Sequence, residues 1–126
     1  MNKNKNAAAI VVVLLVVIGV ALAVFYPKGG PAKGEFNAFA RCLTEKGATM
    51  YGAYWCPHCQ NEKAAFGDSF RYVNYVECTQ ETSKCEAAGI KGFPTWIFQG
   101  GRRFEGEQGL KKLSEESGCV LPASPK

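Results

Sequence analysis

Hydrophobic and polar positions divide the chain into one long apolar run and a series of short periodic segments. The run covers residues 7–26, AAAIVVVLLVVIGVALAVFY, and contains no charged residue. At ~1.5 Å per helical residue, this length spans the ~30 Å hydrocarbon core of a bilayer. Lys3 and Lys5 precede the run, which favours a cytoplasmic N-terminus at residues 1–6. We therefore expect a single transmembrane signal anchor over 7–26, with the rest of the chain on the extracytoplasmic side of the cell membrane.

A cleaved signal peptide is the alternative interpretation of the same run. Ala21-Leu22-Ala23 has the small-x-small form of a cleavage site. The run is, however, longer than the ~7–15 apolar residues of a signal peptide and continues past Ala23. The anchor is the preferred interpretation, and a secreted or periplasmic domain released at Ala23 is the second one.

Beyond a Pro/Gly-rich linker at 27–34, residues 35–120 alternate between helical and strand patterns, and 121–126 form a loose tail. Apolar spacing and helix-start residues predict helices over 35–47, 57–67 and 107–118, with a short helix or turn over 80–90. Apolar or alternating stretches predict strands over 48–55 and 71–78 and a hairpin over 94–106. This order predicts an α/β domain with a central mixed sheet and helices on both faces.

Charge and cysteine content narrow the functional classes. From residue 27 onward the chain has 13 basic and 11 acidic side chains, a formal charge of +2. This balance is too close to neutral to indicate nucleic-acid binding. The chain also has six cysteines, and in a small exported domain most of them are expected to be oxidised.

The sequence AYWCPHCQNE places Cys56 and Cys59 two residues apart. A zinc site would need a second pair of this spacing or paired histidines, but the only histidine, His58, lies between the two cysteines. Haem attachment would need a histidine at position 60, where the chain has glutamine. We therefore predict no metal at this pair and weigh a redox pair against a structural disulfide.

The position of Cys56 favours the redox interpretation. It falls between an apolar strand and a helix whose first residue is Pro57, so the amide groups and dipole of the first helical turn stabilise a thiolate there. His58 adds a further donor and, when protonated, a positive charge. Cys59, one helical turn later, is placed to resolve a mixed disulfide. We expect Cys56, Cys59 and His58 to form the catalytic site.

Trp55-Cys56-Pro57-His58-Cys59, followed by Gly92-Phe93-Pro94-Thr95, resembles the thioredoxin superfamily. The segments GAYWCPHCQNEKAAFG and GIKGFPTW are most similar to the thioredoxin-like domain of bacterial and plant vitamin K epoxide reductase homologues, and the resemblance covers residues 36–118. It implies a thioredoxin-like fold, a cis peptide bond before Pro94, and a substrate site formed by Trp55, Phe93 and Pro94.

The same resemblance implies an activity and partners. The domain would carry disulfides to the thiols of exported proteins, with no cofactor beyond the Cys56–Cys59 disulfide. A quinone-linked membrane protein, vitamin K epoxide reductase-like or DsbB-like, would reoxidise it. Two alternatives stay open: a reductase or isomerase that passes electrons outward, for instance to cytochrome assembly, and a non-catalytic thioredoxin-like binding module.

One departure from the family pattern concerns proton transfer. Thioredoxins have a buried acid six residues before the first cysteine, where this chain has Met50. Removal of the proton from Cys59 would then depend on Glu62, Glu77 or water. The C-P-H-C sequence is more similar to disulfide oxidases than to C-G-P-C reductases, so we expect a pair more oxidising than thioredoxin.

The remaining four cysteines are predicted to form two structural disulfides. Cys78 and Cys85 have six residues between them, a loop that can meet disulfide geometry, and the resembling subfamily has a second pair in this stretch. An auxiliary redox relay is the alternative for this pair. Pairing Cys42 with Cys119 would join the two ends of the domain, although six cysteines allow 15 pairings.

Overall fold

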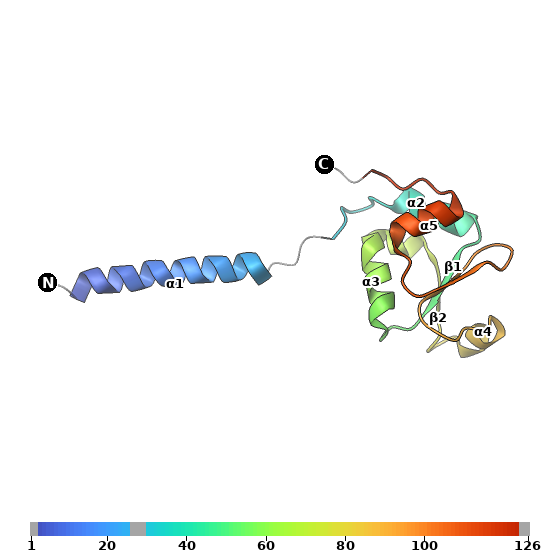
Figure 1. Cartoon of the computed structure of the whole chain (residues 1–126), viewed down its shortest axis with the longest axis horizontal. Helices are drawn as coiled ribbons and strands as arrows, with labels where there is room; N and C mark the ends of the chain where they lie inside the picture. Colours follow the sequence, from blue (N-terminus) through green and yellow to red (C-terminus); the bar gives the residue numbers. More distant parts are fainter. Residues whose placement is uncertain (1–2, 26–29, 124–126) are drawn as a thin grey trace.

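The structure, a computed structural model, describes residues 3–25 and 30–123 (Figure 1). Nine helices and strands follow the N-terminal helix α1 (Lys3–Phe25) within these residues. They are α2 (Asn37–Glu45), β1 (Thr49–Gly52), α3 (Pro57–Phe66), the 3-10 helix η1 (Gly67–Tyr72), β2 (Asn74–Glu77), α4 (Thr82–Ala87), β3 (Thr95–Ile97), β4 (Arg103–Glu105) and α5 (Gly109–Ser117).

Helix α1 covers most of the segment for which a membrane span was predicted. Its apolar side chains from Ile10 to Leu22 are exposed. Among the residues that the structure describes, no helix combines the length and apolar character needed to cross a membrane. The structure therefore does not support the span predicted over 7–26, and Tyr26 lies outside the described residues.

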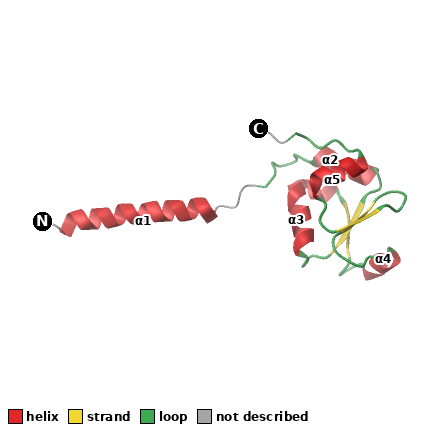
Figure 2. Ribbon diagram, in the orientation of Figure 1, coloured by secondary structure: helices red, strands yellow, loops and turns green. Residues whose placement is uncertain are grey.

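The four strands form one mixed sheet in the order β2-β1-β3-β4 (Figure 2). Strand β1 is parallel to β2 and antiparallel to β3, and β3 is antiparallel to β4. The parallel pair needs a crossover, which α3 and η1 provide, whereas β3 and β4 form the predicted hairpin. This mixed α/β arrangement is consistent with a thioredoxin-like fold.

The core lies on the sheet face that carries Met50 and Gly52, the two buried positions of β1. Trp96 pairs with Met50 across the strands and lies on the same face, where its ring contacts the ring of Phe66 from α3. Figure 1 shows α2, α3 and α5 gathered on one side of the sheet and α4 on the other. The stacked rings of Phe39 and Phe66 join α2 to α3 in this core.

Two predicted strands are shorter than the sequence pattern indicated. The strand predicted over 48–55 ends at Gly52, so the interpretation of Tyr54 as a strand residue was wrong. Tyr54 is 67% exposed and Trp55 is 57% exposed, because the chain turns there and the Cys56 amide bonds to the Ala53 carbonyl.

Likewise, the strand predicted over 71–78 is confined to β2, and η1 replaces its beginning. Contacts with a distant part of the chain stabilise η1. The side chain of Asp68 accepts a hydrogen bond from the Gly34 amide, and the buried Ser69 hydroxyl accepts one from the Phe36 amide. Strand periodicity cannot reveal such tertiary contacts.

Both expected disulfides are present. Cys42 of α2 is bonded to Cys119, which follows α5, across a sequence separation of 77 residues. Cys78 is bonded to Cys85 of α4 across a separation of 7. Cys56 and Cys59 are the free cysteines of the described chain.

Candidate functional site

Cys56 is the N-cap residue of α3. Its backbone is extended (φ −76°, ψ 119°), Pro57 is the first helical residue, and its sulfur accepts a hydrogen bond from the Cys59 amide at 3.4 Å. Proline suits this position because the first helical amide has no partner within the helix. The sulfur therefore lies at the positive end of the helix, where free amide groups stabilise a negative charge.

Cys59 differs from Cys56 in its surroundings, although only two residues separate them. It has no exposed surface, whereas Cys56 is 5% exposed. Burial, followed by the hydrogen bond with Cys56, raises the pKa of the Cys59 thiol to about 12. At neutral pH Cys59 is therefore a protonated thiol, and it can attack a disulfide only after it loses that proton.

The loop before β3 lies next to Cys56. The Phe93–Pro94 peptide bond is cis, and the Cys56 thiol donates a hydrogen bond to the Phe93 carbonyl at 3.6 Å. Pro94 is fully buried, so its side chain supports the loop from beneath. Trp55 and Phe93 make an edge-to-face contact with ring centroids 6.0 Å apart, which places an exposed aromatic surface beside the reactive sulfur.

His58 lies at the rim of the site and turns toward α5. Its Nδ1 is 3.0 Å from the Glu107 carboxylate, which also accepts a hydrogen bond from the Asn61 side chain. The bond to His58, followed by that from Asn61, lowers the pKa of Glu107. Together with residues 106–109, His58 lines an open pocket of about 470 Å³. The structure thus adds Glu107 to the residues of the candidate site, because sequence spacing could not connect it to His58.

Glu62 of α3 is buried, and its carboxylate accepts hydrogen bonds from the amides of Gln108 (2.7 Å) and Gly109 (3.1 Å). These amides are at the start of α5, so Glu62 satisfies donors that have no partner within that helix. Burial raises the pKa of Glu62 against the opposing effect of the two amides. The carboxylate joins α3 to the start of α5.

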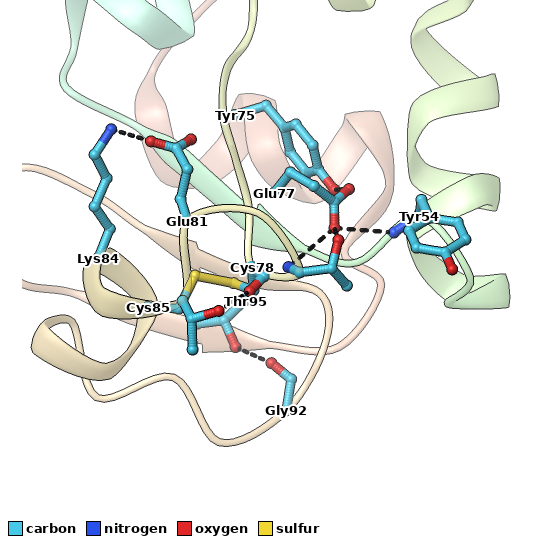
Figure 3. Close-up of a disulfide and its surroundings, with 11 residues drawn as sticks. Tyr54, Tyr75, Glu77, Cys78, Glu81, Lys84, Cys85, Gly92 and Thr95 are labelled. Atoms are coloured by element: carbon cyan, nitrogen blue, oxygen red, sulfur yellow. Dashed lines mark hydrogen bonds and ion pairs between the residues drawn. A yellow bond between two sulfur atoms is a disulfide. The ribbon is translucent and has the colours of Figure 1, made fainter.

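Glu77 lies at the end of β2, and its carboxylate accepts several hydrogen bonds (Figure 3). Its carboxylate accepts hydrogen bonds from the Tyr75 hydroxyl at 2.7 Å and the Thr79 hydroxyl at 2.8 Å, and from the Tyr54 amide at 3.2 Å. Partial burial alone would raise the pKa of Glu77, but these hydrogen bonds lower it overall. Glu77 is therefore an ionised acceptor at neutral pH.

The Cys78–Cys85 disulfide follows Glu77 directly (Figure 3). The Cys78 amide donates to the Gly52 carbonyl at 2.8 Å, which extends the β1–β2 pairing by one residue. On α4, Lys84 and Glu81 form an ion pair close to this disulfide. The disulfide thus joins the end of β2, next to Glu77, to α4, while the hydrogen bond to Gly52 holds that end against β1.

Comparison with known proteins gives a consistent indication of chemistry. The chain is 41% identical over 93 residues to "Thiol-disulfide oxidoreductase LTO1" of Arabidopsis thaliana, covering 67% of this chain and 24% of that protein. It is 29% identical over 85 residues to "Protein disulfide isomerase-like 2-2" of Oryza sativa subsp. japonica, covering 56% and 23%. It is 31% identical over 85 residues to "Probable protein disulfide-isomerase A6" of Medicago sativa, with the same coverage.

These relatives support thiol–disulfide oxidoreductase chemistry. The chain spans about a quarter of the length of the curated relatives it matches, 24% and 23% of the first two. No protein-family model matches the chain. The similarity therefore covers one segment of longer proteins.

The structure brings together most of the residues predicted for the site. Cys56 lies beside Trp55 and Phe93, and the Phe93 carbonyl contacts its sulfur, while Cys59 and Pro94 are buried next to them. His58 is adjacent but bonds to Glu107. Within residues 3–25 and 30–123, no group of three or more His, Cys, Asp or Glu side chains suits a metal ion.

Proposed function

We propose that this protein is an extracytoplasmic thiol–disulfide oxidoreductase that supplies disulfides to exported proteins. One observation carries the proposal: the sulfur of Cys56, a residue that is 5% exposed, lies at the start of a helix, beside the fully buried thiol of Cys59 and next to the Phe93 carbonyl. A thiol at a helix start exchanges disulfides readily, because the free amide groups there stabilise its thiolate.

In the proposed oxidising direction, each of the two sulfurs has a separate role. A substrate thiolate attacks Cys56 of the Cys56–Cys59 disulfide, forming a mixed disulfide and releasing Cys59, which takes up a proton. A second substrate thiolate then attacks the substrate sulfur of the mixed disulfide. This forms the substrate disulfide and releases Cys56 as a thiolate, which the Cys59 amide stabilises. The substrate loses two electrons, and the cysteine pair gains them.

In the proposed function, the protein acts outside the cytoplasm and exchanges electrons with a membrane partner. Two further disulfides suit an oxidising compartment outside the cytoplasm. Return of the pair to the disulfide form needs an electron acceptor, for which we propose a quinone-linked membrane protein, as the resemblance to vitamin K epoxide reductase homologues implies. The N-terminal helix α1, with its exposed apolar side chains, would keep the domain close to such a partner.

Disulfide isomerisation is the second candidate function, because two of the relatives are named protein disulfide isomerases. The redox potential of the Cys56/Cys59 pair distinguishes the candidates. An oxidase is expected well above the ~−270 mV of thioredoxin and toward the ~−120 mV of a strong oxidase, whereas an isomerase is expected nearer ~−180 mV.

Two matched serine variants test the proposed activity. Cys59→Ser should accumulate mixed disulfides with exported proteins that already hold a disulfide, because Cys56 can still attack such a disulfide while the Cys59 thiol that would release the partner is absent. Cys56→Ser should trap none and should lose exchange with a model dithiol. These products are read on non-reducing gels and by mass spectrometry. Absence of trapped species in Cys59→Ser, together with no dithiol exchange by the unmodified protein, would refute the activity.

A further inference from the structure

The buried thiol of Cys59 presents a problem that the cysteine pair cannot solve alone. Resolution of a mixed disulfide needs the Cys59 thiolate, yet Cys59 is fully buried. Met50, at the position six residues before Cys56, is fully buried and apolar, so it cannot accept a proton. Some other group must connect the Cys59 sulfur to solvent.

The sheet register places two polar side chains of β2 on the face that Cys59 covers. In the parallel β1–β2 pair, Tyr75 is the partner of Met50 and Glu77 is the partner of Gly52. Because side chains alternate between the two faces of a strand, Tyr75 and Glu77 share the face of Met50 and Gly52. This is the face against which α3 packs.

Gly52 allows Cys59 of α3 and Tyr75 of β2 to approach each other. A Cβ atom added to Gly52 would lie 2.9 Å from the Cys59 sulfur and 3.3 Å from the Tyr75 hydroxyl. The Cys59 sulfur and the Tyr75 hydroxyl therefore both pack over the Gly52 backbone, which has no side chain. The distance between these two atoms is no greater than the sum of their distances to the added Cβ atom. The Tyr75 hydroxyl in turn donates to the Glu77 carboxylate at 2.7 Å.

A positive charge also lies near Cys59 and Tyr75. The Lys63 ammonium of α3 lies 3.7 Å from the centroid of the Tyr75 ring and acts to lower the pKa of Cys59. The ionisable groups around the Cys59 sulfur are thus Cys56 and Lys63 from α3 and the Tyr75–Glu77 pair from β2. Burial, the hydrogen bond to Glu77 and its charge raise the pKa of Tyr75, which keeps its hydroxyl protonated.

Glu62 of α3, the other candidate acid, is almost fully buried (1% exposed). Both of its oxygens accept hydrogen bonds from the amides that begin α5. Glu77 instead reaches the Cys59 cluster through Tyr75 and is only partly buried, so a proton that arrives there can pass to solvent.

We propose that Tyr75 and Glu77 form the proton relay of Cys59, a role that rests on the proposed exchange activity. When Cys59 resolves a mixed disulfide, its proton passes to the Tyr75 oxygen, directly or over one water, while the Tyr75 proton moves to Glu77. The Cys59 thiolate forms the bond to Cys56, the bond between Cys56 and the partner sulfur breaks, and the partner leaves as a thiolate. The cysteine pair is oxidised by two electrons, and the partner disulfide is reduced. In the oxidising direction the proton travels back along the same groups.

The test uses the reduced protein and the aromatic disulfide 5,5′-dithiobis(2-nitrobenzoate), which releases one coloured thiolate per step. The first release reports attack by Cys56, and the second reports resolution by Cys59. In Tyr75→Phe, we expect the rate of the first phase to stay within about twofold of the unmodified protein and the rate of the second phase to fall at least about tenfold at pH 7. This loss is smaller than the ~10²–10⁴-fold effect of a direct general base, because water can substitute for the hydroxyl. At alkaline pH, hydroxide removes the Cys59 proton, so the difference should shrink.

Two matched variants complete the experiment. Tyr51→Phe removes a hydroxyl from the opposite face of β1 and should leave both phases unchanged. Glu77→Gln should slow the second phase as Tyr75→Phe does. If Tyr75→Phe fails to fold, the rate of the second phase in Glu77→Gln tests the relay by itself. An unchanged second phase in a folded Tyr75→Phe or Glu77→Gln protein would overturn the relay. Absence of both phases in the unmodified protein would instead refute the exchange activity.

Discussion

The chain contains two cysteine pairs of short spacing, and the structure treats them in opposite ways. Cys56 and Cys59 are free thiols at the start of α3, beside exposed aromatic side chains. Cys78 and Cys85 are bonded to each other between the end of β2 and α4, and both are buried. Burial is similar in the two pairs, so burial does not separate a redox site from a structural link.

Local electrostatics and the neighbouring side chains distinguish the pairs. One sulfur of the first pair receives an amide hydrogen bond at a helix start and lies beside an exposed ring, whereas the second pair fixes a strand end and its Glu77 carboxylate. The contrast explains why an identical chemical bond can be exchanged at one place and retained at another. Removal of the structural disulfides should accordingly change stability far more than exchange chemistry.

The largest effect on stability is expected from the Cys42–Cys119 disulfide. Replacement of both cysteines by serine opens a loop of sequence separation 77, which costs ~4.5 kcal/mol of unfolding free energy in the chain-entropy model. Urea unfolding of the double variant measures this loss. A change below about 1 kcal/mol would show that this link does not constrain the unfolded chain as the model requires.

A smaller effect is expected from the Cys78–Cys85 disulfide, whose sequence separation is only 7. Its double serine variant should lose ~2.5 kcal/mol of unfolding free energy by the same model. Exchange per folded molecule should stay within about threefold, because neither sulfur takes part in the proposed step. If protein substrates were no longer oxidised while the small aromatic disulfide still reacted, this pair would be a redox relay and the comparison above would fail.

The local part of the site was predictable from the sequence. An apolar strand, Pro57 after Cys56 and one helical turn to Cys59 are all encoded within ten residues, and the strand–helix junction follows from them. Because side chains alternate along a strand, the segment RYVNYVEC alone puts Tyr75 and Glu77 on the same face. Helix α3 and the β3–β4 hairpin fall where the pattern indicated.

Contacts between distant segments could not be predicted in this way. His58 and Glu107 are 49 positions apart, and Glu62 and Gln108 are 46 apart, so no periodicity connects them. The exposure of Tyr54 was missed for a related reason: its aromatic ring continues the apolar strand pattern, but the turn before Cys56 ends the strand at Gly52.

The asymmetry between the two thiols of the active pair is the central claim, and iodoacetamide alkylation tests it most directly. Cys59→Ser and Cys56→Ser each leave one active-site thiol, with both structural disulfides intact. Because burial raises the pKa of Cys59 to about 12, this thiol should react slowly at pH 7 and about tenfold faster per pH unit toward alkaline pH, as its thiolate fraction rises. We predict that Cys56 reacts at least ~10²-fold faster than Cys59 at pH 7. Equal rates, or faster alkylation of Cys59, would contradict the account.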